Sequence, residues 1–193
     1  FSIGTGCVVN LGTGLSHNAK TLYLAGVAQS SSSYGGTGSG AVNINTTYFS
    51  AVTGVLYTTN MWTGATNTDW NVATNWRRGT VPIATEDAYI QNVTNKPVVG
   101  ASGAVCNNLT IATNSSVTLS GSNSLTLSGE LINAGTFTSN AGTLSLAGTL
   151  TNTGTFNANT GTVNYNGTAQ TVATVTYNNL TLSGSGIKTL QAG

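Results

Sequence analysis

Apolar and polar positions recur along the second half of the chain with a period of 19 residues. Residues 129–147 read GELINAGTFTSNAGTLSLA, and residues 148–166 read GTLTNTGTFNANTGTVNYN. The two segments align without a gap and are identical at 9 of 19 positions. A weaker third copy keeps the same step, since Val175 follows Phe156 and Leu182 follows Val163. A fixed period of this kind indicates a repeat architecture.

A unit of this length is too short for a pair of helices or a propeller blade, and it contains no helical period of apolar residues. It fits one coil of a parallel β-helix, in which short strands joined by Gly or Asn turns stack about 4.8 Å apart. The strands expected in one coil are residue 131, residues 136–138 and residues 143–146. Because side chains alternate along a strand, their apolar members point inward and their Thr and Ser members outward. The sequence therefore predicts an all-β fold, a β-solenoid with about 19 residues per coil.

Equivalent residues of successive coils should form columns. Two expected columns are apolar and buried, and one is a row of turn asparagines: Phe137, Phe156 and Val175; Leu144, Val163 and Leu182; and Asn140, Asn159 and Asn178. Burial of each apolar side chain contributes about 1.5 to 3 kcal/mol, so several coils must stack before the ordering entropy is overcome. The asparagines either bond the neighbouring coil as a ladder or only tolerate left-handed turn geometry, and the sequence leaves both interpretations open.

Three segments follow from the pattern: a β-rich segment at 1–58, a Trp-rich entry segment at 59–104, and the coils at 105–193. In the first, we expect strands at residues 7–11, 21–24, 41–44 and 54–57, with a flexible loop or linker at 30–40. Residues 106–127 have the same alternation but do not fit the 19-residue register, which predicts irregular first coils.

The two ends of the sequence give further expectations. The chain opens with FSIG, without Met or a basic region, as if processed or cut. The pattern runs to residues 187–193 without a polar cap. Because solenoids need caps, we expect either further chain or another molecule to cover that end.

Composition narrows the functional classes. Thr, Gly, Asn and Ser make up more than half of the chain, whereas charged residues are 5%, against roughly 25% in an ordinary soluble domain. Such a surface cannot neutralise a run of phosphates, so we expect no nucleic-acid partner. No apolar run approaches the roughly 20 residues of a membrane span, so we expect no membrane insertion. Cys7 and Cys106 could form a bridge, but their spacing does not decide it.

The three tryptophans, Trp62, Trp70 and Trp76, lie in one block together with both adjacent arginines. Indoles supply large apolar area and an N–H group that can reach a partner at a rim, which suits a cap closing the first coil. The alternative is a glycan-binding platform on which the indoles stack against sugar rings. We favour the cap, because the sequence does not show that the three rings are exposed or coplanar.

The same block resembles modules of large, repetitive, secreted surface proteins of Gram-negative bacteria, often exported by the type IX route. The matching motifs are W-T-G at 62–64, D-W at 69–70, N-W at 75–76, G-T-V-P at 79–82 and D-A-Y-I at 87–90. Residues 1–58 look like the closing segment of a preceding module and are similar to autotransporter-associated β repeats, through GGTG at 35–38, INTTYF at 44–49 and TGVL at 53–56. The resemblance implies an extracellular or cell-surface location, and it is weak evidence for any one activity.

Catalytic and metal-binding groups are scarce, namely Asp69, Glu86, Asp87, Glu130 and His17. Adjacent Glu86 and Asp87 would face opposite sides of a strand, which does not suit a carboxylate pair, so we expect no enzymatic role. A Ca²⁺ site of Asp69, Glu86 and Asp87 is conceivable, but the usual acidic loop is absent, and ion pairs with Arg77 and Arg78 are the favoured use. No cofactor is expected.

Outward threonine rows at Thr136/Thr155 and Thr143/Thr162 raise ice binding as another class. The neighbouring outward positions drift, since Thr138 becomes Asn157, and this irregularity disfavours that class.

The sequence thus predicts a non-enzymatic extracellular structural protein, a repeat module of a bacterial surface filament or adhesin. We expect head-to-tail self-association, in which the Trp-rich segment or residues 1–58 of one copy covers the coil near Gly186 of the next. The alternative is a glycan-binding adhesin that uses the three tryptophans against surface glycans or a host cell.

Overall fold

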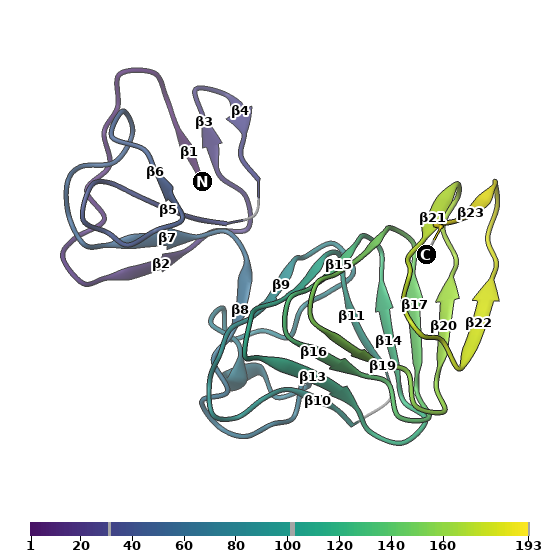
Figure 1. The fold of residues 1–193 in the computed structure, drawn as a ribbon. Coiled ribbons are helices and arrows are strands. Elements are labelled where there is room, and N and C mark those ends of the chain that lie inside the picture. Colours follow the sequence, from purple (N-terminus) through teal and green to yellow (C-terminus); the bar gives the residue numbers. More distant parts are fainter. Residues whose placement is uncertain (31, 101–102, 193) are drawn as a thin grey trace. The chain divides into compact units, whose positions relative to one another are not determined.

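The computed structural model describes residues 1–30, 32–100 and 103–192, so residues 31, 101, 102 and 193 of the expected segments lie outside it. The chain divides into two compact units, residues 1–60 and 61–193. Apart from one short 3-10 turn, η1 (Ala73–Asn75), every regular element of the described residues is a strand (Figure 1). The all-β prediction is confirmed.

The first unit contains two small sheets. Their strands are β1 (Ser2–Ile3), β2 (Ser16–Asn18), β3 (Tyr23–Leu24), β4 (Val27–Ala28), β5 (Ser33–Gly35), β6 (Asn43–Ile44) and β7 (Val55–Tyr57). The sheet orders are β1-β3-β4 and β2-β7-β5-β6. A core of its own, which includes Phe49 and Leu56, lies between them and their connections.

Two expectations for this unit were wrong. The Ser/Gly-rich segment 30–40 is not simply a loop, because it contains β5, whose Tyr34 is buried and donates a hydrogen bond to the Ser30 carbonyl at 2.7 Å. This one aromatic anchor outweighs the flexible composition around it. Residues 7–11 form no strand, only an isolated bridge between Val9 and Phe49.

The second unit is a stack of short strands in three larger sheets and one pair. The strands are β8 (Asn60–Trp62), β9 (Ala88–Ile90), β10 (Val98–Val99), β11 (Ala104–Cys106), β12 (Leu109–Ile111), β13 (Ser116–Leu119), β14 (Ser124–Leu127), β15 (Leu131–Asn133), β16 (Thr136–Thr138), β17 (Thr143–Leu146), β18 (Leu150–Asn152), β19 (Thr155–Asn157), β20 (Thr162–Tyr165), β21 (Gln170–Val172), β22 (Asn179–Leu182) and β23 (Lys188–Leu190). We name the large sheets first (β8-β9-β12-β15-β18), second (β10-β13-β16-β19) and third (β11-β14-β17-β20-β22). The remaining pair is β21-β23.

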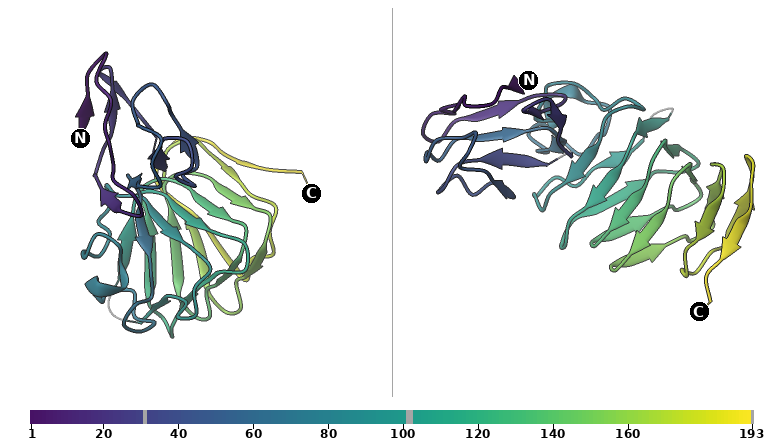
Figure 2. Two further views of the ribbon diagram at one scale, coloured as in Figure 1. Left: turned by 90° about the vertical axis from the view of Figure 1, so that its left-hand side faces the viewer. Right: turned by 90° about the horizontal axis from the view of Figure 1, so that it is seen from above.

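The register shows that this unit is a parallel β-solenoid. Phe137 pairs with Phe156, and Leu144 with Val163, each one 19-residue period further along the chain. The two phenyl rings stack with their centroids 5.3 Å apart. Successive strands of each large sheet run side by side along the stack, as the two views of Figure 2 show. The predicted β-solenoid and its central register are confirmed.

The coils begin earlier than the 19-residue match suggested. Residues 109–127 form a full coil in register with the next one, as expected for the irregular first coils at 106–127. Strands β9, β10 and β11 form the coil before it, and β9 and β10 lie inside the segment 59–104 that was expected to be an entry region. Partners in these coils are 19 to 22 residues apart, because extra residues are accommodated in the turns.

The last coil departs from the expected columns. Val163 pairs with Leu180, and Leu182 pairs with Tyr165, so the assignment of Leu182 to the Leu144/Val163 column was wrong by two residues. The cause is a shorter connection between β20 and β22, of 13 residues instead of the 15 between β17 and β20. Val175 packs against the core but lies outside any strand.

The turn asparagines form a ladder between coils and also adopt left-handed turn geometry, so both interpretations hold. Asn159 Nδ2 donates to Asn140 Oδ1 at 3.1 Å, and Asn140 Nδ2 donates to the Leu119 carbonyl at 2.7 Å, which makes a ladder across coils. Both residues also have positive φ, 52° at Asn140 and 48° at Asn159. The expected third member, Asn178, is replaced by Asn179, whose side chain donates to the Thr160 carbonyl at 3.1 Å.

Candidate functional site

The three tryptophans close the first end of the solenoid. All are buried, and Trp76 contacts both others edge-on, with ring centroids 5.0 Å from Trp62 and 4.7 Å from Trp70. The indole N–H of Trp62 donates to the Asn95 carbonyl at 2.7 Å, and that of Trp76 to the Trp70 carbonyl at 2.8 Å. This arrangement is a cap. The sugar-platform interpretation was wrong for these residues, because no indole face is left for a ring to stack on.

The backbone around the tryptophans also satisfies sheet edges. Trp70 donates its N–H to the Val98 carbonyl at 3.0 Å, and Val98 donates to the Thr68 carbonyl at 2.7 Å, which extends the second sheet beyond β10. Strand β8 likewise lies beyond β9 in the first sheet. At this end, backbone N–H and C=O groups at the edges of the first and second sheets therefore pair within the chain, where unpaired groups could bind another chain.

The charged residues near this end hold its loops. Arg78 pairs with Glu86 at 3.5 Å, as expected, and burial lowers the pKa of the Arg78 guanidinium while Glu86 and Asp87 offset part of that shift. Asp87 Oδ1 accepts hydrogen bonds from the side chains of Asn107 and Asn108, each at 2.9 Å. These carboxylates are positioned to stabilise connections between coils.

The remaining candidate groups are dispersed. Glu130 accepts a hydrogen bond from Thr149 Oγ1 at 3.4 Å, and His17 Nε2 lies 2.7 Å from the Leu11 carbonyl oxygen in the first unit. Among the described residues, no three His, Cys, Asp or Glu side chains gather where they could hold a metal ion.

The two cysteines are not joined. Cys7 is exposed in the first unit, and Cys106 is buried in the solenoid core. Burial, together with the charge of Asp87, raises the pKa of the Cys106 thiol, so this thiol stays protonated and unreactive at ordinary pH.

At the other end of the solenoid, the last strands of the described residues have exposed apolar side chains. Strand β22 is the last of the third sheet, and all four of its residues are exposed. Leu180 and Leu182 are 37% and 43% exposed, although their register partners Val163 and Tyr165 are fully buried. The two leucines therefore continue the inward-facing columns onto a surface that nothing in this unit covers.

The pair β21-β23 also has exposed apolar side chains. Ile187 and Leu190 are 78% and 63% exposed. A hollow of about 270 Å³ lies between the strands, lined by Ala169, Gln170, Thr171, Ile187 and Thr189. Lys188 fixes the preceding turn, since its ammonium group donates to the carbonyls of Gly167, Thr168 and Ser185. We call Leu180, Leu182, Ile187 and Leu190 the open-end patch.

A ring of hydrogen bonds lies beneath the open-end patch. The Ala173 N–H donates to Tyr165 Oη at 3.2 Å, Tyr165 Oη lies 2.9 Å from Tyr177 Oη, and Tyr177 donates to the Ala173 carbonyl at 2.7 Å. Burial and the hydrogen bond with Tyr165 raise the pKa of the Tyr177 hydroxyl above its ordinary value. Sequence reasoning missed this network, although the change from Leu146 to Tyr165 at one buried position was a visible signal.

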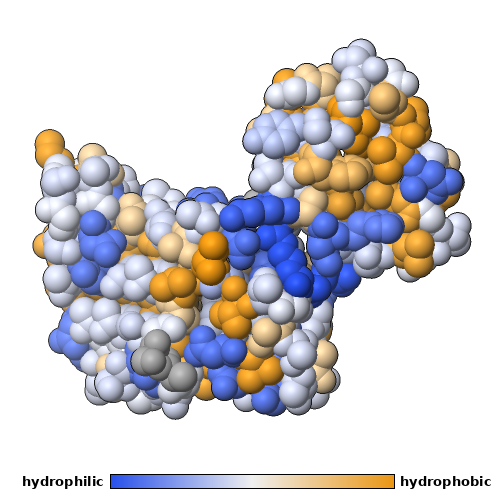
Figure 3. All heavy atoms as spheres, turned by 180° about the vertical axis from the view of Figure 1, so that it is seen from behind, coloured by the Kyte–Doolittle hydropathy of each residue, from blue (hydrophilic) through white to orange (hydrophobic). Residues whose placement is uncertain are grey.

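The surface elsewhere is weakly polar. Most of the face of residues 61–193 seen in Figure 3 has intermediate hydropathy, in keeping with outward rows of Ser, Thr and Asn. No helix within the described ranges has the length and apolar character needed to cross a bilayer.

These features define a class of protein, a β-solenoid repeat domain with a cap of buried tryptophans at its first end. Residues 61–189 match the model of a domain of unknown function, DUF8693, and the chain therefore belongs to this family. No curated protein and no solved structure matches the chain.

Proposed function

We propose that the protein is a non-enzymatic structural module of a bacterial surface filament or adhesin, and that copies stack end to end through the open-end patch. The observation that carries the proposal is the half-exposure of Leu180 and Leu182 in register with fully buried partners. A further parallel strand laid on β22 would bury both leucines and pair the backbone groups of the strand edge.

The geometry of such a contact leads to fibres. The open end of one copy differs from the surface that would cover it, so the contact is heterologous, and heterologous contacts that do not close generate filaments. The Trp-rich segment of the next copy is already closed by its own indoles and backbone bonds. Residues 1–58 are the better covering surface, because Val42 and Ile44, at the edge strand β6, are 80% and 50% exposed.

The stacking proposal is tested with two lysine substitutions on one strand. Leu182→Lys places a charge in the contact, whereas Thr181→Lys, its matched control, places the same charge on the outward face of β22. We expect the native protein to form elongated polymers by electron microscopy and sedimentation, Leu182→Lys to weaken association at least about tenfold, and Thr181→Lys to leave it unchanged. Native protein that stays dispersed as monomers at high concentration would refute end-to-end stacking.

The proposed location is extracellular, at the cell surface. Its support is the resemblance to secreted surface modules and a surface solubilised by hydroxyls and amides, with charged residues at only 5%. Antibody labelling of intact cells that carry the natural protein should detect it without permeabilisation. Labelling that appears only after permeabilisation would contradict this location.

A further inference from the structure

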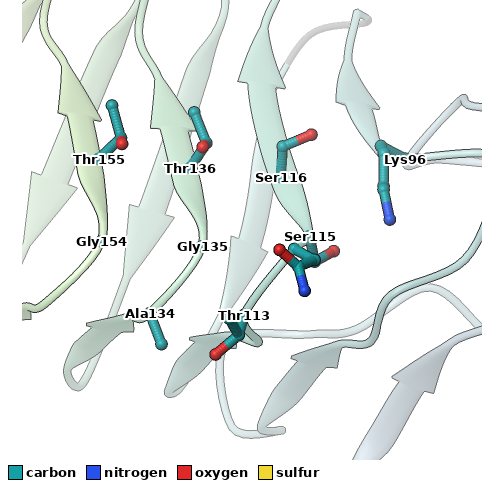
Figure 4. Close-up of a pocket in the computed structure, with 10 residues that line it drawn as sticks. Lys96, Thr113, Ser115, Ser116, Ala134, Gly135, Thr136, Gly154 and Thr155 are labelled. Carbon is teal, nitrogen blue, oxygen red and sulfur yellow. The ribbon is translucent and has the colours of Figure 1, made fainter.

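A polar groove runs along the corner between the first and second sheets (Figure 4). Its volume is about 410 Å³, within the range of small-ligand sites. It crosses three successive coils at the turns 112–115, 134–135 and 153–154. The site belongs to neither the tryptophan cap nor the open-end patch.

A change in turn length creates the groove. The connection from β12 to β13 has four residues and includes Asn114 with φ of 61°, whereas the corresponding connections of the next two coils have two residues each. The four-residue turn 112–115 projects further and forms one wall of the groove, and the two-residue turns 134–135 and 153–154 form its floor. Glycine is required in that floor, since a Cβ on Gly154 would lie 2.1 Å from the Gly135 carbonyl oxygen. The turns of successive coils therefore stack closely at this corner.

The side chains along the groove are polar and available. Ser116, Thr136 and Thr155 form a register column, so their hydroxyls repeat about every 4.8 Å. Within the part of the chain that the structure describes, these three hydroxyls and the side chains of Thr113 and Asn114 take part in no hydrogen bond. Most other inter-coil asparagines do, as in the Asn140/Asn159 ladder.

Lys96 gives one end of the groove a positive charge. Its ammonium group contacts the side-chain oxygen of Asn92, and among the described residues no carboxylate pairs with it. The lining contains no aromatic or large apolar side chain, which disfavours an apolar ligand. A single cation is too few for a nucleic acid, which needs several charges along its backbone.

We propose that this groove binds an extended acidic saccharide, with the hydroxyl column and Asn114 bonding sugar hydroxyls and Lys96 bonding a carboxylate. A shallow groove open to solvent suits a chain lying along it better than an enclosed small molecule. The inference does not rest on end-to-end stacking, because its site and its readout are separate from the open-end patch.

The test is a titration of the isotope-labelled 193-residue protein with tetragalacturonate, followed by amide chemical shifts in NMR spectra. The fully methyl-esterified tetrasaccharide, which lacks the carboxylates, is the ligand control. We expect a dissociation constant of about 1 mM for the acid, with shifts concentrated at residues 113–116, 134–136 and 154–155, and binding about tenfold weaker for the ester. Absent shifts, or shifts centred elsewhere, would overturn the site.

Matched variants identify the groups involved. Thr136→Val keeps the branched shape and should weaken binding about threefold to tenfold, whereas Thr136→Ser should retain it. Lys96→Gln should weaken binding of the acid about tenfold and remove the preference over the ester. Thr143→Val, an outward position of the third sheet outside the groove, should have no effect. Equal binding of acid and ester by the native protein would overturn the assignment of an acidic ligand.

Discussion

The two ends of the solenoid differ in how their terminal apolar side chains and strand edges are covered. At the first end, three buried tryptophans fill the space above the first coil, and neighbouring backbone pairs with the edges of the first and second sheets. At the other end, Leu180 and Leu182 continue the inward columns but stay half-exposed. Both ends are built from strands that pair in parallel with the next coil. What differs is whether side chains of this unit complete the burial, and this difference separates a cap from a candidate interface.

Removal of the central tryptophan should produce the largest effect on stability. Trp76→Ala deletes the ring that contacts both other indoles and should lower the free energy of unfolding by about 3 to 5 kcal/mol. Urea denaturation followed by circular dichroism measures the change. Leu182→Ala, at the open end, is the control and should cost well below that in dilute solution, since its side chain is already 43% exposed. If Trp76→Ala and Leu182→Ala lower the free energy of unfolding by similar amounts, the two ends do not differ in how completely their side chains are buried.

The stacked phenylalanines give a comparison within one column. Phe137 is fully buried between coils, whereas Phe156 is only partly buried on β19, the last strand of its sheet. Phe137→Ala should cost about 3 to 5 kcal/mol of unfolding free energy, and Phe156→Ala about half as much. Chemical denaturation of dilute samples measures both. If Phe156→Ala costs as much as Phe137→Ala, the side chain is covered in solution and the end is not open.

The sequence predicted the centre of the solenoid well because identity at a fixed spacing carries the register directly. Where 9 of 19 positions repeat, the aligned pairs Phe137/Phe156 and Leu144/Val163 are the paired residues of the structure. Alternation then placed their apolar side chains inside. The cap could also be predicted as the favoured interpretation, since an indole combines large apolar area with an N–H group that reaches a partner at a rim.

The remaining features depend on turn lengths, which the period alone does not determine. A shorter connection moved Leu180 into the position expected for Leu182, and longer turns put the predicted irregular coil before residue 129 out of the 19-residue register and hid the coil before it. The corner groove has the same origin, because it exists only where a four-residue turn precedes two-residue turns. In the first unit, composition suggested flexibility at 30–40, but burial of Tyr34 decided the outcome.

The hydrogen bonds among Tyr165, Tyr177 and Ala173, beneath the open-end patch, should contribute the smallest and most pH-dependent part of the stability. Tyr177→Phe removes the donor to the Ala173 carbonyl and the partner of Tyr165, and should lower the unfolding free energy by about 1 to 2 kcal/mol at neutral pH. Because burial raises the folded-state pKa of Tyr177, the neutral hydroxyl is favoured in the folded protein. The stabilisation is therefore complete below the unfolded-state pKa of about 10 and is lost as the pH rises above it.

Urea denaturation at a series of pH values from neutral to strongly alkaline separates this residue from the other tyrosines, which both proteins share. The native protein should lose stability above about pH 10 faster than Tyr177→Phe, so that the difference between them narrows as the pH rises. A difference that stays constant across this range would mean that the Tyr177 hydroxyl ionises as freely in the folded protein as in the unfolded chain. The hydrogen bonds of Tyr177 with Tyr165 and Ala173 would then not favour the neutral hydroxyl in the folded protein, and this end of the solenoid would be more accessible to water than those bonds imply.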